Sequence, residues 1–340
     1  MVRMLQVHSL LSLVVLLSLP GLSHADPSAS LGQFSGRYLE FEHVKSPSKD
    51  FPLPKSLRKA VVFWEEVFIT YEKTQLIIHD RENQNIIWSV YKVPADDGTK
   101  ATRKLIQSQT DHYLDSVRAA LQHLEDNGKP RNKWEAGAVQ FLSKHSTTKP
   151  QPLHKASKRV RAQRGVSNDL RAGRKRAEPW LTKIEAELKK QGLPTEIALM
   201  TFVESMFNTK AHSSAGAAGI WQLMPATARE LGLQVSRKKD ERMDVLKATK
   251  AASKLLKRNY KMLESWPLAV TGYNHGAYGV KRAIRKVGSR KLEDLIEKYE
   301  KRSWGFASKN FYAELIAMIR IFNNETTTSN KSTVVYRKPS

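Results

Sequence analysis

The chain has 340 residues, enough for two domains of ordinary size or for one domain with a long extension. Lysine and arginine number 57 against 33 aspartate and glutamate residues, so the formal net charge is +24. The mean hydropathy of −0.49 excludes a protein that crosses a membrane many times. The absence of cysteine excludes disulfides, thiolate metal sites, a cysteine nucleophile and a lipidated cysteine.

Residues 1–25 have the pattern of a secretory signal peptide. Arg3 supplies the positive start, residues 10–19 form an apolar run too short to span a bilayer comfortably, and residues 23–25 fit a small-x-small cleavage site. A short N-terminal anchor is the alternative. Because an exported protein meets polyanions of the cell envelope before it meets nucleic acid, we expect the positive charge to serve an envelope polymer or a membrane surface.

The first part of the mature chain predicts a small mixed region. Residues 26–56 are rich in Ser, Pro and Gly and are expected to form a flexible lead-in. Apolar periodicity and β-branched runs then predict an N-terminal helical and hairpin region over 57–128. Its expected elements are helices over 57–71 and 104–124 and strands over 74–79 and 85–90.

Residues 129–177 are interpreted as a basic connector. Between Lys144 and Arg176 there are eleven basic residues and a single acid, Asp169. A charge run of this kind is ordinarily a solvated surface, and the alternative is a contact surface for an anionic polymer.

From residue 178 to residue 323 the pattern is that of an all-α domain, which makes the predicted fold class mainly α. Pro and Gly mark where successive helices begin and end. The helix predicted over 195–205 is apolar nearly all round and should be the buried central helix. Residues 324–340 are expected to form a polar tail. Further helices are expected to begin near Pro179, Pro225, Asp244, Pro267, Gly276, Lys291 and Phe311.

One carboxyl group lies on the apolar face of the predicted central helix. Ile197, Met200 and Glu204 follow one another at steps of three and four, so they share the face that turns toward the interior. Burial would raise the pKa of an acid that has no partner there. An acid that stays protonated near neutral pH is what general acid catalysis requires. The alternative is an acid at a helix end that points into solvent.

The segments that follow have features typical of sugar binding. Residues 212–219 are small and allow a bulky ligand to approach the backbone. Residues 220–225 add an aromatic ring from Trp221, an amide and a thioether, and the tight turn at 273–276 adds a phenol and a second amide. Rings of this kind stack on apolar sugar faces, although a Trp or Tyr in a helical domain is more often part of the core.

Taken together, these segments resemble the soluble lytic transglycosylase family, whose goose-type lysozyme-like domain cleaves peptidoglycan. The resemblance covers roughly 178–323 and is greatest to the membrane-bound lytic transglycosylase D type. It implies a lysozyme-like helical catalytic domain preceded by the smaller helical and hairpin region. The family's late Glu-Thr-Arg-x-Tyr element is not evident, with Asn310-Phe311-Tyr312 only a loose substitute. The matching motifs are Gly192-Leu193-Pro194, Val203-Glu204-Ser205 with Phe207-Asn208, the run from Gly216 to Pro225, and Tyr273-Asn274-His275-Gly276.

The resemblance implies a role for each matching residue. Glu204 would be the sole catalytic acid and base, with Ser205 supporting its geometry. The residues implied to bind substrate are Ser205, Gln222, Met224, Tyr273 and Asn274. The implied partner is the glycan strand of peptidoglycan in the periplasm or envelope of a bacterium. We expect a monomer with at most peripheral membrane contact, no nucleic-acid partner, no cofactor and no metal.

A second carboxylate is the point on which the mechanism depends. An ordinary glycosidase uses two carboxyl groups, yet residues 206–228 contain no acid. The remote candidates are Asp240, Asp244 and Glu264. A single acid suits a non-hydrolytic reaction in which Glu204 protonates the bond between N-acetylmuramic acid and N-acetylglucosamine. It would then take a proton from the hydroxyl on carbon 6, so that a 1,6-anhydro ring closes. The alternatives are a hydrolytic lysozyme of the same fold and a non-catalytic peptidoglycan-binding protein.

Overall fold

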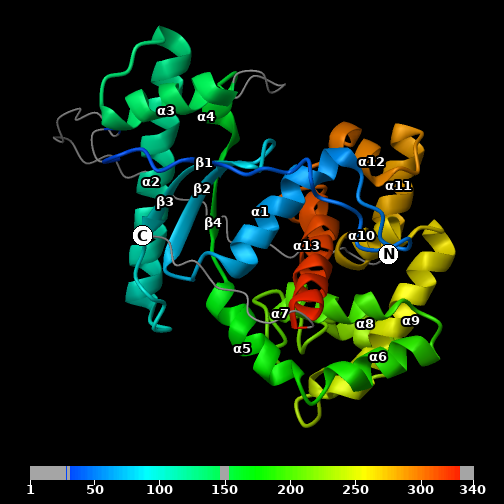
Figure 1. Ribbon diagram of the computed structural model, residues 1–340. Coiled ribbons are helices and arrows are strands. Elements are labelled where there is room, and N and C mark those ends of the chain that lie inside the picture. The colour runs from blue at the N-terminus through cyan, green and yellow to red at the C-terminus, as the bar shows by residue number, and fades with distance from the viewer. Residues whose placement is uncertain (1–27, 29–30, 146–152, 330–340) are drawn as a thin grey trace. The chain divides into compact units, whose positions relative to one another are not determined.

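The computed structural model describes Ser28 and residues 31–145 and 153–329, with side chains up to residue 324 (Figure 1). The described chain divides into two compact units. One unit, called the catalytic unit for the activity that the family resemblance implies, consists of residues 44–65 and 169–329, and the sheet unit consists of residues 28–43 and 66–168. The prediction of a mainly α protein is confirmed. The signal peptide expected over 1–25 lies outside the described residues.

The sheet unit is built on four antiparallel strands in the order β1-β3-β2-β4. Strands β2 and β3 are the predicted hairpin, with Ile77 opposite Val90. The other two strands were not predicted from the sequence. The strands are β1 (Arg37–Tyr38), β2 (Gln75–Asp80), β3 (Ile86–Lys92) and β4 (Val160–Arg164), and the helices are α2 (Lys100–Asn127), α3 (Lys133–His145) and α4 (Ala156–Arg159).

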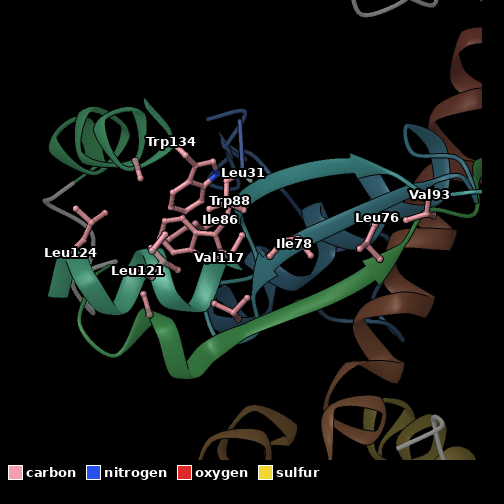
Figure 2. Close-up of a cluster of buried hydrophobic side chains, with 14 residues drawn as sticks. Leu31, Leu76, Ile78, Ile86, Trp88, Val93, Val117, Leu121, Leu124 and Trp134 are labelled. Carbon is pink, nitrogen blue, oxygen red and sulfur yellow. The ribbon is translucent and has the colours of Figure 1, made fainter. Parts of the chain in front are cut away.

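The core of the sheet unit lies between the strands and α2 (Figure 2). Val117, Leu121 and Leu124 occupy one face of α2, as the predicted helical spacing requires, and all three are buried. Trp134 is fully buried, and its indole Nε1 donates a hydrogen bond of 2.8 Å to Ser89 Oγ. The buried indole of Trp134 therefore has its polar atom satisfied.

The described parts of the basic segment, residues 129–145 and 153–177, are folded, so their interpretation as a connector is wrong, although most of their lysine and arginine side chains are exposed as expected. Three helices and strand β4 form within it, the last helix being α5 (Ser167–Ala177). Arg159, just before β4, donates a hydrogen bond of 2.8 Å from Nε to the buried carboxylate of Asp80. The same carboxylate accepts the backbone N–H groups of Glu82 and Asn83 in the hairpin turn. Charge pairing with a partner far away in the sequence allows this cationic segment to pack.

The lead-in expected over 26–56 is also partly folded, contrary to its interpretation as flexible. Residues 37 and 38 form β1 in the sheet unit. In the catalytic unit Val44 and Phe51 are fully buried, and the hydroxyl of Tyr312 donates a hydrogen bond of 2.7 Å to Pro52 O. Isolated apolar residues in a Ser- and Pro-rich stretch therefore fill gaps in a core that is formed by distant helices.

The catalytic unit is helical throughout. Its longest helix, α13, packs against α7 and α10 (Figure 1). Helix α13 also contacts α1 through a hydrogen bond from Arg320 to Glu65. Trp64 Nε1 of α1 donates to Asn310 Oδ1 at 3.0 Å. The elements are η2 (Lys55–Leu57), α1 (Arg58–Ile69, shared with the sheet unit), α5, α6 (Leu181–Lys190), η3 (Thr195–Leu199), α7 (Met200–Ser205), α8 (Pro225–Glu230), η4 (Glu241–Met243), α9 (Val245–Leu263), α10 (Trp266–His275), α11 (Ala277–Val287), α12 (Leu292–Lys298) and α13 (Phe306–Ser329).

The predicted helix boundaries hold where a capping residue marks them. Asp244 accepts the backbone N–H of Lys247 at 2.9 Å and begins α9, and Pro225 occupies the first turn of α8. The helix predicted over 195–205 differs, because its first half is the 3₁₀ turn η3, a common start for an α-helix. Helix α13 continues into the expected polar tail as far as Ser329, and the rest of the tail lies outside the described residues.

Among the described residues, no helix combines the length and the apolar character that a membrane crossing requires.

Replacing Ser89 with Ala should destabilise the fold. The substitution leaves the indole N–H of Trp134 without an acceptor in a fully buried position, which costs about 1–3 kcal/mol. The measurement is the free energy of unfolding in denaturant. Ser143→Ala on the exposed surface of α3 is the control, expected to change stability by less than about 0.5 kcal/mol. Equal stabilities of the two variants would contradict the role of Ser89.

Candidate active site

Glu204 lies near the end of the six-residue helix α7 and is partly buried. Burial raises the pKa of its carboxyl from the ordinary value of 4.5 to about 8, and the charge of Glu314 adds to the increase. The carboxyl is therefore protonated at neutral pH. This is the environment that the apolar spacing of Ile197, Met200 and Glu204 predicts, rather than an acid that extends into solvent.

The helix ends in a backbone turn that needs outside support. Met206 and Phe207, two consecutive non-glycine residues, have the left-handed φ angles of 48° and 53°. Arg176 of α5 holds both carbonyl groups, with Nη2 donating to Met206 O at 2.7 Å and Nε to Phe207 O at 3.1 Å. Gly173 makes this approach possible, because a Cβ atom there would lie 2.4 Å from Met206 O. Helix α5 therefore fixes the end of α7 and the direction of Glu204.

Two hydroxyl groups attach α7 and α10 to the same short segment of backbone. Ser205 Oγ donates to Ile220 O at 3.1 Å, and Tyr273 OH donates to Trp221 O at 2.7 Å. Burial raises the pKa of the Tyr273 phenol well above its ordinary value, and the charge of Glu204 adds to this. Tyr273 is thus a neutral donor at all physiological pH values. The phenol is therefore close enough to the Glu204 carboxyl for the charge of Glu204 to raise its pKa.

Trp221 does not offer a ring face to a ligand. It is fully buried, and its Nε1 donates a hydrogen bond of 2.9 Å to Thr249 Oγ1. The sugar-stacking interpretation of this ring is therefore wrong, and its place in the core is the correct reading. The residues on either side of the buried Leu223, namely Gln222 and Met224, are partly exposed.

The amide of Gln222 is oriented by the loop that precedes it. Its Nε2 donates to Gly219 O at 2.8 Å and approaches Ala211 O at 3.4 Å. Within the described part of the chain, the amide oxygen of Gln222 has no hydrogen-bond partner. Its backbone has a φ of 45°, a strained value for glutamine that persists only where the surroundings impose it.

Arg242 binds the backbone at both ends of the loop 216–223. Its Nη1 donates to Gly216 O at 2.7 Å and to Leu223 O at 2.9 Å, and Asp240 fixes the guanidinium with hydrogen bonds of 2.9 and 2.7 Å. Gly219 has a φ of +76°, and a Cβ atom there would lie 1.9 Å from Arg242 O. The glycine-rich sequence is therefore required by close backbone packing, independently of any ligand.

The structure adds Glu314, a residue that the sequence analysis did not name. It lies on α13, which packs against α7 through the rings of Phe322 and Phe202 at 4.9 Å between centroids. Burial raises the pKa of the Glu314 carboxyl to about 8, and its charge reaches Glu204. A signal was present in the sequence, because Glu314 is the one charged residue in the apolar run 311–319.

The three remote acids that were considered as partner carboxylates have other roles. Asp240 is bound to Arg242, and Asp244 caps α9. Glu264 forms an exposed ion pair with Arg290 at 3.1 Å. The second carboxyl near Glu204 comes from α13 instead.

The predicted turn residue Asn274 is connected to α13 through Ser308. The hydroxyl of Ser308 donates to Asn274 Oδ1 at 3.4 Å and lies 2.9 Å from His275 Nδ1. Burial and the cations Arg282 and Lys301 lower the pKa of His275 to about 4, so this ring is neutral at physiological pH. Tyr312, the loose substitute for the family's late tyrosine, contacts Pro52 O and belongs to the core.

Within the described residues, no three His, Cys, Asp or Glu side chains lie close enough together to hold a metal ion. The structure thus brings Glu204, Ser205 and Tyr273 together around the loop that carries Gln222. It places Asn274 next to Tyr273 on α10 and Met224 at the end of the same loop.

Residues 182–296 match the family model described as the transglycosylase SLT domain. The resemblance predicted from the motifs is confirmed for this segment. Two Escherichia coli proteins named membrane-bound lytic murein transglycosylase D are each 43% identical over 111 residues, which is 32% of this chain and 25% of theirs. An Alteromonas protein named for tributyltin chloride resistance is 40% identical over 116 residues, covering 34% of this chain and 56% of that protein.

The chain therefore spans a quarter of the length of the two murein transglycosylases it matches. Among solved structures, an inactive mutant of the lytic transglycosylase Slt from Pseudomonas aeruginosa aligns over 66% of this chain and 33% of that one. The identity there is 18% and the TM-score is 0.36. The SLT-matching segment contains Glu204, the Gln222 loop and Tyr273, whereas Arg176 of α5 and Glu314 of α13 lie outside it.

Replacing Glu204 with Gln should stabilise the protein at alkaline pH. The folded-state pKa of about 8 exceeds the ordinary 4.5, so ionisation opposes folding, and wild-type stability falls as pH rises between these two values. We expect equal melting temperatures at pH 4 and a melting temperature several degrees higher for the variant at pH 9. Glu297→Gln, at an exposed position of α12, is the control. A variant less stable than wild type at pH 9 would contradict the account.

Proposed function

We propose that the catalytic unit is a peptidoglycan lytic transglycosylase. It would cleave the β-1,4 bond between N-acetylmuramic acid and N-acetylglucosamine without water, leaving a 1,6-anhydromuramyl end. The observation that carries the proposal is Glu204, a protonated acid held beside Tyr273 and the Gln222 loop in a segment that matches the transglycosylase SLT domain. The names of the relatives support the same activity.

Glu204 supplies the proton in the first step. With a pKa of about 8 it is mainly protonated at pH 7 and still able to release the proton, as a general acid must. The proton goes to the glycosidic oxygen, the bond from that oxygen to the anomeric carbon breaks, and N-acetylglucosamine leaves as a neutral alcohol. An oxocarbenium-like centre develops on the muramic acid, which its own N-acetyl group stabilises.

The neighbouring polar groups are arranged to orient the substrate. The Oδ1 atom of Asn274 is occupied by the hydroxyl of Ser308, so its amide N–H groups are available to donate to a substrate hydroxyl or acetamido oxygen. The amide oxygen of Gln222 is the complementary acceptor. The hydroxyl of Tyr273 already donates its hydrogen bond to Trp221 O. Its part in binding is therefore to accept a hydrogen bond from the substrate and to hold the loop in place. Met224 supplies apolar contact at the start of α8.

Glu204 takes part again in the second step. As a carboxylate it accepts the proton of the hydroxyl on carbon 6 of the muramic acid, and the oxygen of that hydroxyl forms a bond to the anomeric carbon. The 1,6-anhydro ring closes and the acid is restored. One proton leaves Glu204 and one returns, so no water is consumed and no second carboxylate is needed.

Glu314 gives specific support to a second candidate, a hydrolytic lysozyme-like reaction. A hydrolase needs an ionised partner to act as nucleophile or to activate water. Burial gives Glu314 a pKa of about 8, so at neutral pH it is largely protonated and is neither nucleophile nor base. We therefore favour the transglycosylase and assign to Glu314 the role of raising the pKa of Glu204 further as Glu314 ionises.

The charge and the N-terminal pattern support an envelope location. The proposed substrate carries free carboxylates on its peptide stems, and a chain of net charge +24 would concentrate on such a polymer. We propose that the protein is exported and acts in the periplasm or cell envelope of a bacterium.

Glu204→Gln should reduce the rate of turnover of purified sacculi by about 10²–10⁴-fold, because the general acid is gone. The measurement is release of soluble muropeptides followed by mass spectrometry, and the wild type should yield 1,6-anhydro ends. Glu297→Gln serves again as the matched control. Near wild-type turnover by Glu204→Gln would end the proposal, and reducing ends in place of anhydro ends would establish the hydrolase.

Glu314→Gln should shift the pH profile. For the wild type, kcat/KM should fall as pH rises through about 8, where Glu204 loses its proton. Removing the charge of Glu314 lowers the pKa of Glu204, so the alkaline limb of the variant should move to lower pH. The variant should remain active at pH 6. Loss of activity at every pH would instead indicate that Glu314 takes part in the chemistry as a nucleophile or base.

A further inference from the structure

A cationic pocket lies on the catalytic unit between the end of α11 and the segment that follows α12. It is open to solvent and has a volume of about 520 Å³. Its lining brings together four cations and one carboxylate, so a strong positive potential is expected there. The lining residues are Arg282, Arg285, Lys286, Tyr299, Glu300 and Lys301.

The pocket contains more cations than the end of one helix would place there. Arg285 and Lys286 lie in the last turn of α11, where cations complement the helix dipole. Lys301 comes from a separate segment beyond α12, and Arg282 lies one turn earlier on α11. Arg285, Lys286 and Lys301 are all exposed, so their charges face a ligand rather than the core.

The wall of this pocket is connected to the proposed substrate-binding turn by a series of direct contacts. The ring of Tyr299 meets that of Trp304 edge-on at 5.5 Å between centroids, and Trp304 meets His275 edge-on at 4.6 Å. His275 Nδ1 then lies 2.9 Å from the hydroxyl of Ser308, which donates to Asn274. The cations Arg282 and Lys301 are close enough to His275 to lower its pKa.

We propose that this pocket binds a carboxylate of the peptide stem on the muramic acid next to the cleaved bond. The inference rests on the proposed function, because Asn274 would then contact the sugar that carries the stem. Guanidinium groups bind carboxylates in a bidentate manner, and an open pocket suits a flexible peptide. The pocket would give the enzyme a preference for glycan strands that still carry stems.

The first test compares two substrates. Glycan strands with peptide stems, and the same strands after enzymatic removal of the stems, are assayed with wild type and with the double variant Arg285→Glu/Lys286→Glu. We expect the wild type to prefer stem-bearing strands and the ratio of kcat/KM values to fall about tenfold in the variant. An unchanged ratio would overturn the proposal.

The matched control is Lys189→Glu/Lys190→Glu. These two lysines are exposed and occupy the last turn of α6, so the control reverses the same number of charges at an equivalent helix position. It should keep the wild-type ratio. If the control lowers the ratio as much as the pocket variant does, the preference comes from overall charge and the pocket proposal fails.

A second measurement does not depend on turnover. A soluble stem peptide is titrated into the full-length protein by isothermal calorimetry, beside the same peptide with its carboxylates converted to amides. Binding that is weaker for the amidated peptide and for Arg285→Glu/Lys286→Glu supports the pocket, and equal binding in all cases contradicts it. If the wild type cleaves neither glycan substrate, the proposed function is refuted. The calorimetric titration still tests whether the pocket binds a stem carboxylate.

Discussion

The desolvation of the Glu204 carboxyl is the constraint on which the rest of the site depends. The six-residue helix α7 carries the acid among apolar neighbours, and α13 brings Glu314 toward it. Two carboxyl groups in one poorly solvated region cannot both ionise easily, so each favours the protonated state of the other. The backbone turn that ends α7 is strained as well. Helix α5 supports this turn through Arg176 and Gly173.

The position of the loop that carries Gln222 follows from the same arrangement. Ser205 and Tyr273 donate to the adjacent carbonyls of Ile220 and Trp221, so the helix of the acid and the helix of the binding turn are joined through one piece of backbone. Arg242 secures the other side of the loop. These contacts fix the acid and the amide of Gln222 relative to one another, which is the preorganisation that the proposed single-acid mechanism requires.

Sequence reasoning predicted features that depend on local pattern and missed those that depend on distant partners. Helical spacing placed Glu204 on the apolar face of its helix, the family resemblance implied its role, and a local cap identified the start of α9. The sequence left open whether the ring of Trp221 stacks on a sugar or belongs to the core, because sequence spacing does not reveal a partner such as Thr249. Glu314 was not among the predicted partner acids, because α13 reaches α7 only through the tertiary fold. The segment 129–177 was taken for a connector because its acid partner, Asp80, is far away in the chain.

The central claim is that the Glu204 carboxyl titrates far above an ordinary glutamate, and direct titration tests it best. NMR spectra of protein labelled with carbon-13 at the glutamate carboxyls would be recorded from pH 4 to pH 10, with Glu204→Gln and Glu314→Gln used to assign the pair. The account predicts two carboxyl signals that titrate near 8, with the Glu204 signal moving to lower pH in Glu314→Gln. If every glutamate carboxyl titrates near its ordinary 4.5, Glu204 is solvated and the account is contradicted.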